Sequence, residues 1–259
     1  MSNLVRSMTK IEWVGDGVIE GQVNEREFVI DGGNGPIPGI VWMPEEAEKP
    51  LPLVLFGHGG SGHKRVSRAL MLGRRFAGVS QFAMVAIDGP AHGDRKGPGQ
   101  TDLQDLYAER GLDNVIDGMV DDWNATLACF SEMDLVDANQ AAYVGFSMGC
   151  RFGLPFVAAA GDKLKCAVLG KNALARIAEP DGQDRLGQRF KDDAPNIHIP
   201  LLFHVQWDDE LFARDSQFAL FDLISSTDKR MICYPGAHAR SSPESVDHWC
   251  DFVESHLRA

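Results

Sequence analysis

A serine, two adjacent aspartates and a histidine follow one another along this sequence in an order that could support nucleophilic catalysis. Ser147 lies at the centre of Gly145-Phe-Ser-Met-Gly149, Asp208 and Asp209 come later, and His238 lies near the C-terminal end. A serine hydroxyl is a poor nucleophile until an imidazole accepts its proton, and a carboxylate fixes the tautomer of that imidazole and stabilises its charged form. These residue types therefore indicate acyl transfer through a covalent intermediate on Ser147.

The residues around Ser147 predict a sharp turn between a strand and a helix. Residues 141–144 are apolar and strand-like, and residues 150–160 are helix-like. In this order Gly-x-Ser-x-Gly is typical of a nucleophile elbow, whose strained backbone lifts the serine hydroxyl clear of the sheet edge. Glycines flank the serine because side chains there would collide with the neighbouring strand or helix. Pro155 lies within the predicted helix, where it favours a kink.

Strand-like and helix-like stretches alternate along most of the chain, after an N-terminal hairpin at residues 25–30 and 37–43. Further strands are predicted at residues 53–56, 82–87, 141–144, 166–169, 200–205 and 230–234, and helices at 64–77, 114–133, 150–160, 215–225 and 242–257. This alternation predicts an α/β fold with a mainly parallel central sheet and helices on both faces. We expect one domain over residues 1–259, with residues 171–196 as a loop or small cap inserted over the sheet.

Functional groups gather at the carboxyl ends of the strands in such sheets. Ser147, the Asp208–Asp209 pair and His238 each follow a predicted strand, and glycines follow the strand that ends at Phe56. Negative charge on a tetrahedral intermediate needs preorganised donors. The backbone amides of Gly60 and Met148 are the candidates for this oxyanion hole.

Five motifs together resemble those of the α/β-hydrolase superfamily, in its dienelactone-hydrolase-like esterase branch. They span roughly residue 40 to the end of the chain and are Gly57-His-Gly-Gly60, Asp88-Gly-Pro-Ala-His-Gly93, Gly145-Phe-Ser-Met-Gly149, Trp207-Asp-Asp-Glu210 and Pro235-Gly-Ala-His238. The resemblance implies that Ser147 is the nucleophile, Asp209 the acid and His238 the base. Dienelactone hydrolases proper carry cysteine at the nucleophile position, so Ser147 points to ester substrates more generally.

The acid and the base each have competitors. The family pattern places the acid three residues before the apolar position that Phe212 holds, which selects Asp209, whereas Asp208 is expected to be a solvated loop residue or a group beside the site. His248 and His256 fall within the closing helix rather than after a strand.

Several other residues have simpler structural explanations. Cys150 lies one helical turn past Ser147 and is expected to pack in the core. Asp88 and His92 could imitate a catalytic pair, but the resemblance implies a structural turn. The glycines at 57–62 lack the Gly-Lys-Ser/Thr ending of a phosphate-binding loop. Two histidine pairs, His58 with His63 and His198 with His204, could suggest a metal site. Their spacings match no metal-ligand pattern, and a glycine-rich turn explains His58.

Composition restricts the partners. The 259 residues include 25 basic and 37 acidic side chains, a net charge of −12, which argues against nucleic acid or an anionic membrane. This charge slightly favours neutral over anionic substrates, although a local field could reverse the preference. The five cysteines are scattered and form no CxxC pair, residues 1–10 lack the apolar core of a signal peptide, and no apolar run is long enough to cross a bilayer. A cytoplasmic location is expected.

The sequence therefore predicts a cytoplasmic serine hydrolase of the carboxylesterase type that acts on small to medium esters without a cofactor or metal. Thioesters, amides or carbon–carbon bonds remain alternative targets, because the same triad chemistry would cleave them. A catalytically silent binding protein with this fold is a further alternative, and the oligomeric state stays open.

Overall fold

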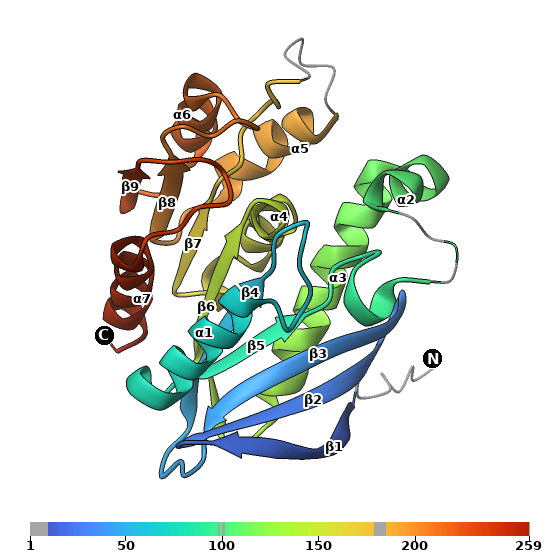
Figure 1. Ribbon diagram of the computed structural model, residues 1–259, viewed down its shortest axis with the longest axis vertical. Coiled ribbons are helices and arrows are strands. Elements are labelled where there is room, and N and C mark those ends of the chain that lie inside the picture. Colours follow the sequence, from blue (N-terminus) through green and yellow to red (C-terminus); the bar gives the residue numbers. More distant parts are fainter. Residues whose placement is uncertain (1–9, 98, 100–101, 179–184, 259) are drawn as a thin grey trace, which may run out of the picture.

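The computed structural model describes residues 10–97, 99, 102–178 and 185–258, and their strands form one nine-stranded sheet. The order across the sheet is β1-β2-β3-β5-β4-β6-β7-β8-β9, with β1–β3 at one end and β8–β9 at the other (Figure 1). The strands are β1 (Ile11–Glu20), β2 (Val23–Gly32), β3 (Gly35–Pro44), β4 (Leu51–Gly57), β5 (Ala83–Ile87), β6 (Val136–Phe146), β7 (Cys166–Gly170), β8 (Leu201–Gln206) and β9 (Lys229–Tyr234).

The sheet is mainly parallel, as predicted. Strands β1 to β3 form an antiparallel meander, and β3 pairs antiparallel with β5. All pairings from β5 through β4, β6, β7 and β8 to β9 are parallel. The carboxyl ends of these strands therefore meet at one edge, where the predicted functional residues lie.

Helices cover both faces of the sheet, which explains why β4, β5 and β7 are almost continuously apolar. On one face, Leu72 of α1 and Trp249 of α7 pack in a core with Phe56 of β4. On the other face, residues of α3 and α4 pack in a second core together with Leu55 of β4. The helices are α1 (Ser67–Arg75), α2 (Leu103–Arg110), α3 (Leu112–Ser131), α4 (Met148–Ala160), α5 (Arg185–Asp193), α6 (Arg214–Leu223) and α7 (Pro243–Leu257). None of the helices in the described part of the chain is long and apolar enough to cross a membrane.

Two short helices lie outside the stretches that the sequence predicted to be helical. Helix α2 precedes α3, and α5 occupies part of the expected insertion at residues 171–196. Leu186 and Phe190 of α5 are buried in the same core as α4, so this helix belongs to the layer that covers the sheet. Residues 179–184 of the expected insertion lie outside the described residues, and a cap at this place stays a prediction.

The turn between β6 and α4 depends on a close backbone approach. Ser147 has φ 58° and ψ −117°, a conformation that L-residues rarely adopt. A Cβ atom on Gly149 would lie 2.1 Å from the carbonyl oxygen of Gly57 at the end of β4. A Cβ on Gly145 would lie 2.6 Å from the carbonyl oxygen of Gly149, which accepts a 2.8 Å hydrogen bond from the Tyr143 hydroxyl. Helix α4 continues through Pro155.

We expect Gly149→Ala to lower the free energy of unfolding by about 2–3 kcal/mol, because the new methyl group meets fixed backbone rather than a flexible side chain. The measurement is urea unfolding of the variant and of wild type. Gly33→Ala is the matched control, since a Cβ there meets nothing within 4 Å. Equal stability of the two variants would show that α4 can move away from β4 at little cost.

Candidate active site

Ser147, His238 and Asp209 form one chain of hydrogen bonds at the carboxyl edge of the sheet. The Oγ of Ser147 lies 2.9 Å from Nε2 of His238, and Nδ1 of His238 lies 2.8 Å from Oδ2 of Asp209. Ser147 follows β6, Asp209 follows β8 and His238 follows β9; β8 and β9 are adjacent in the sheet, and β7 lies between β6 and β8. In this arrangement the imidazole can accept the hydroxyl proton of Ser147 while its other ring nitrogen donates to the carboxylate.

The two adjacent aspartates have different partners. The side chain of Asp209 is fully buried, and its second oxygen, Oδ1, accepts hydrogen bonds from the amides of Leu211 (2.8 Å) and Phe212 (3.1 Å). Asp208 is exposed, and its Oδ2 accepts from the amide of Gly236 at 2.8 Å. The structure therefore brings Asp209 to the histidine ring, and Asp208 braces the turn that precedes His238.

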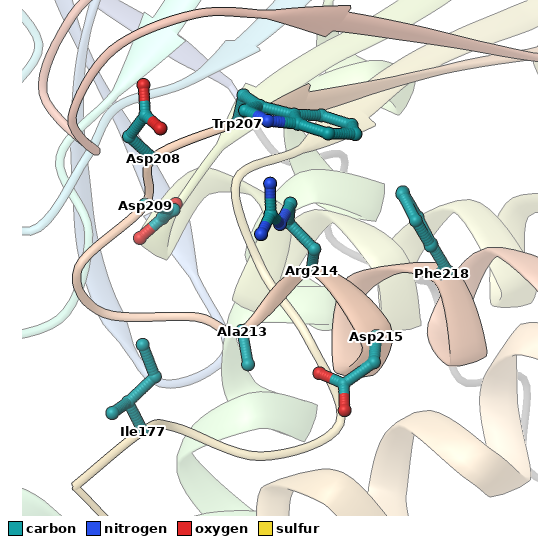
Figure 2. A pocket seen from close by; sticks show the side chains of 8 residues that line it. All are labelled: Ile177, Trp207, Asp208, Asp209, Ala213, Arg214, Asp215 and Phe218. Atoms are coloured by element: carbon teal, nitrogen blue, oxygen red, sulfur yellow. The ribbon is translucent and has the colours of Figure 1, made fainter.

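Asp208 and Asp209 also line a separate open cavity of about 640 Å³, together with residues at the start of α6. Figure 2 shows the two carboxylates directed away from each other beside Trp207. The guanidinium of Arg214 lies 4.4 Å from the centre of the Trp207 ring. Ser147 is not among the described residues that line this cavity, so it is not the place where the serine hydroxyl is presented.

The serine hydroxyl faces another cavity, of about 770 Å³, which Ser147 and His238 line together with Gly60 and Met148. The basic side chains around it are Arg68, Lys96, Arg151, Lys171 and Arg176. The only acidic side chain in the described lining is Asp102, whose carboxylate accepts hydrogen bonds from two amides at the start of α2. Basic side chains therefore outnumber acidic ones around this cavity, although the whole chain is acidic. Positions 98 and 100 of the polar stretch 94–100, and positions 179–184 of the stretch 171–196, lie outside the described residues.

The two predicted oxyanion-hole residues lie next to each other. Met148 is the first residue of α4, where backbone amides have no acceptor within the helix. A Cβ on Gly60 would be 3.8 Å from the Cβ of Met148. Both residues line the cavity that Ser147 lines, which is where a donor pair for a developing oxyanion is needed.

No family model and no curated protein matches this chain. Solved structures do. A cold-adapted esterase from an Arctic intertidal metagenomic library is 28% identical, with a TM-score of 0.79, over 95% of this chain and 99% of that one. An acetyl xylan esterase from Paenibacillus sp. R4 (20% identical, TM-score 0.76, 96% and 88% covered) and a putative dienelactone hydrolase from Klebsiella pneumoniae (19%, 0.70, 92% and 99%) share the fold. This chain has the α/β-hydrolase fold. Its predicted resemblance to the dienelactone-hydrolase-like esterase branch is confirmed.

The sequence explained His58 by a glycine-rich turn alone, but in the structure this side chain connects two loops beside the site. It is buried, its Nδ1 donates to the carbonyl oxygen of Gly59 (2.8 Å), and its Nε2 accepts from the amide of Gly89 (2.9 Å). The carbonyl of Gly59 and the amide of Gly60 belong to one planar trans peptide and point in opposite directions. By holding the carbonyl, His58 orients the Gly60 amide. The His-Gly-Gly spacing was the available signal.

The remaining residues weighed as candidates in the sequence have structural roles. Asp88 is fully buried and accepts hydrogen bonds from the amides of Lys64 (2.7 Å) and Asp94 (2.9 Å), which fixes the turn after β5. The thiol of Cys150 is buried, which raises its pKa to about 12. Within the described part of the chain, no three His, Cys, Asp or Glu side chains gather closely enough to hold a metal ion.

Two buried histidines make the stability of the protein sensitive to acid. Burial lowers the pKa of both His58 and His204 from the usual 6.5 to about 4. The unfolded chain therefore binds more protons than the folded one between pH 6.5 and about 4. We therefore expect the free energy of unfolding to decrease as the pH is lowered from 6.5 to about 4, by about 1.4 kcal/mol per pH unit for each histidine.

Denaturant unfolding at a series of pH values measures this slope. His204→Gln should remove about half of the histidine contribution, and His198→Gln, at an exposed position, should leave it unchanged. A slope that His204→Gln does not alter would mean that His204 is charged in the folded protein.

Proposed function

We propose that this α/β-hydrolase is a serine carboxylesterase in which Ser147 is the nucleophile, His238 the general base and acid, and Asp209 the orienting carboxylate. The observation that carries the proposal is the continuous hydrogen-bond chain from Ser147 Oγ to Asp209, with the serine end open to a cavity. The similarity to a solved esterase at 28% identity supports an esterase-type activity.

The expected reaction has two halves. In the first, His238 takes the proton of Ser147 as its Oγ attacks the ester carbonyl, and then gives that proton to the leaving alcohol. The amides of Gly60 and Met148 stabilise the negative charge that develops on the substrate oxygen. In the second half, His238 activates a water that attacks the acyl-enzyme, which releases the acid and restores the serine. In each half the proton and the acyl group pass only between the substrate, water, Ser147 and His238, so the reaction needs no cofactor.

The cavity supports small to medium substrates. A volume of about 770 Å³ holds a ligand of that size, and such pockets are ordinarily about 300–1,000 Å³. The basic side chains at its walls support acyl groups that are neutral or negatively charged. Thioesters, amides and carbon–carbon bonds stay open as alternatives, because the same three side chains would cleave them. No disulfide joins the cysteines of the described residues, which supports the proposed cytoplasmic location.

Hydrolysis of p-nitrophenyl esters from acetyl to dodecanoyl is the direct test. We expect wild type to be active with short and medium chains and Ser147→Ala to lose that activity entirely. Ser67→Ala is the control, since Ser67 lines the same cavity but lies outside the hydrogen-bond chain. Wild-type inactivity, together with no labelling of Ser147 by a fluorophosphonate, would favour a silent binding protein.

The two aspartates provide a second test. Asp209→Asn should lower kcat by about 10³- to 10⁴-fold, because an amide in place of the carboxylate favours the wrong tautomer of His238. Asp208→Asn should change kcat by less than about threefold, since the new amide can still accept from Gly236 through its oxygen. Steady-state kinetics on one ester measures both, and a reversed order would reassign the acid to Asp208.

A further inference from the structure

Three consecutive residues at the end of β7 contact both the nucleophile and the base, although the proposed triad uses none of them. The carbonyl oxygen of Gly170 accepts from the amide of Ser147 at 3.1 Å. The side-chain amide of Asn172 donates to the carbonyl oxygen of Ser147 at 3.0 Å. Between them, Nζ of Lys171 donates to the carbonyl oxygen of His238, also at 3.0 Å.

Lys171 is built into the fold rather than placed on its surface. It is 1% exposed, and its backbone has φ 50°, which L-residues rarely adopt. Its own amide donates to the carbonyl oxygen of His204 at 2.9 Å. A long side chain held this way loses nearly all its conformational freedom, so its contacts must compensate for that loss.

The ammonium group of Lys171 has three N–H donors, and three acceptors surround it. They are the carbonyl oxygens of His238 and Arg240 and, at 3.1 Å, the hydroxyl of Ser241. All three belong to the loop of residues 238–241, between β9 and α7. All three N–H groups of the ammonium therefore have acceptors in the segment that carries the proposed catalytic base.

The charges around Lys171 make this burial costly. Burial and then the nearby charge of Arg68 lower the pKa of Lys171 to about 7, while Asp209 acts in the opposite direction. Below that pH the group is an ammonium with three donors, whereas the neutral amine has only two N–H groups for three acceptors. The charged form thus fits the loop fully.

His238 is held on both sides of its α-carbon. Its backbone amide donates to the carboxylate of Glu210 at 2.8 Å, and its carbonyl oxygen accepts from Lys171. The hydrogen bond from His238 lowers the pKa of Glu210. A negative group thus holds the N–H and a positive group holds the C=O, and this fixes the direction in which the imidazole leaves the backbone.

We propose that Lys171 is the positioning residue for the catalytic base: its ammonium group anchors the 238–241 loop so that Nε2 of His238 stays within reach of Ser147 Oγ. This role rests on the proposed esterase function. It differs from a purely structural role because its loss should slow chemistry in a protein that is still folded. A displacement of about 1 Å at a reacting group can cost about 100-fold in rate.

The test compares Lys171→Met, which removes all three donors, with Lys171→Gln, which keeps two. Lys165→Met is the control, an exposed lysine just before the same strand. Kinetics on p-nitrophenyl butyrate give kcat and KM, and hydrogen–deuterium exchange reports on the amides of residues 238–241. We expect Lys171→Met to lower kcat about 100-fold with KM within about threefold of wild type, Lys171→Gln to fall in between, and loop exchange to accelerate in the same order.

Three results would overturn the proposal: a folded Lys171→Met protein with wild-type kcat, a raised KM with unchanged kcat, or slowed turnover without faster loop exchange. If Lys171→Met does not fold, Lys171→Gln decides in the same way. If wild type shows no esterase activity, the function fails, but the exchange comparison still decides whether Lys171 anchors the loop.

Discussion

The contact between the start of α4 and the end of β4 is the constraint on which the site depends. Only glycine at position 149 lets the helix lie this close to Gly57, and that closeness forces Ser147 into a backbone conformation that costs about 1–3 kcal/mol. The strain persists because the peptide groups on both sides of Ser147 are held: its amide donates to Gly170, and its carbonyl oxygen accepts from Asn172. The result is a hydroxyl that cannot relax back into the sheet.

Parallel pairing converts this local constraint into a site. Strands β6, β8 and β9 all end at the same edge, so Ser147, Asp209 and His238 meet although as many as 91 positions separate them in sequence. Strand β7 lies between β6 and β8 and contributes no member of the triad. Its end instead supplies contacts to the neighbours on either side, which is what a central position in a parallel sheet allows.

The sequence predicted the parts of the molecule that depend on local pattern. Buried parallel strands are continuously apolar, and the motifs at their ends identified Ser147 and His238, whereas the choice of Asp209 over Asp208 needed the family pattern. Helix α5 was missed because it has few apolar positions, and burial of Leu186 and Phe190 stabilises it where its own sequence does not. The basic wall of the cavity was also missed, since its residues come from segments scattered along the chain.

The contacts of His58 and Lys171 were missed for a related reason, because each side chain joins loops that are far apart in sequence. Their chemistry differs in an instructive way. A neutral imidazole donates from one nitrogen and accepts at the other, so His58 can hold a carbonyl of its own loop and an amide of the next. An ammonium only donates, so every partner of Lys171 must be an acceptor, and the carbonyls of His238 and Arg240 have to converge on it. A loop that turns its carbonyls inward in this way has little freedom left in where it directs the His238 ring.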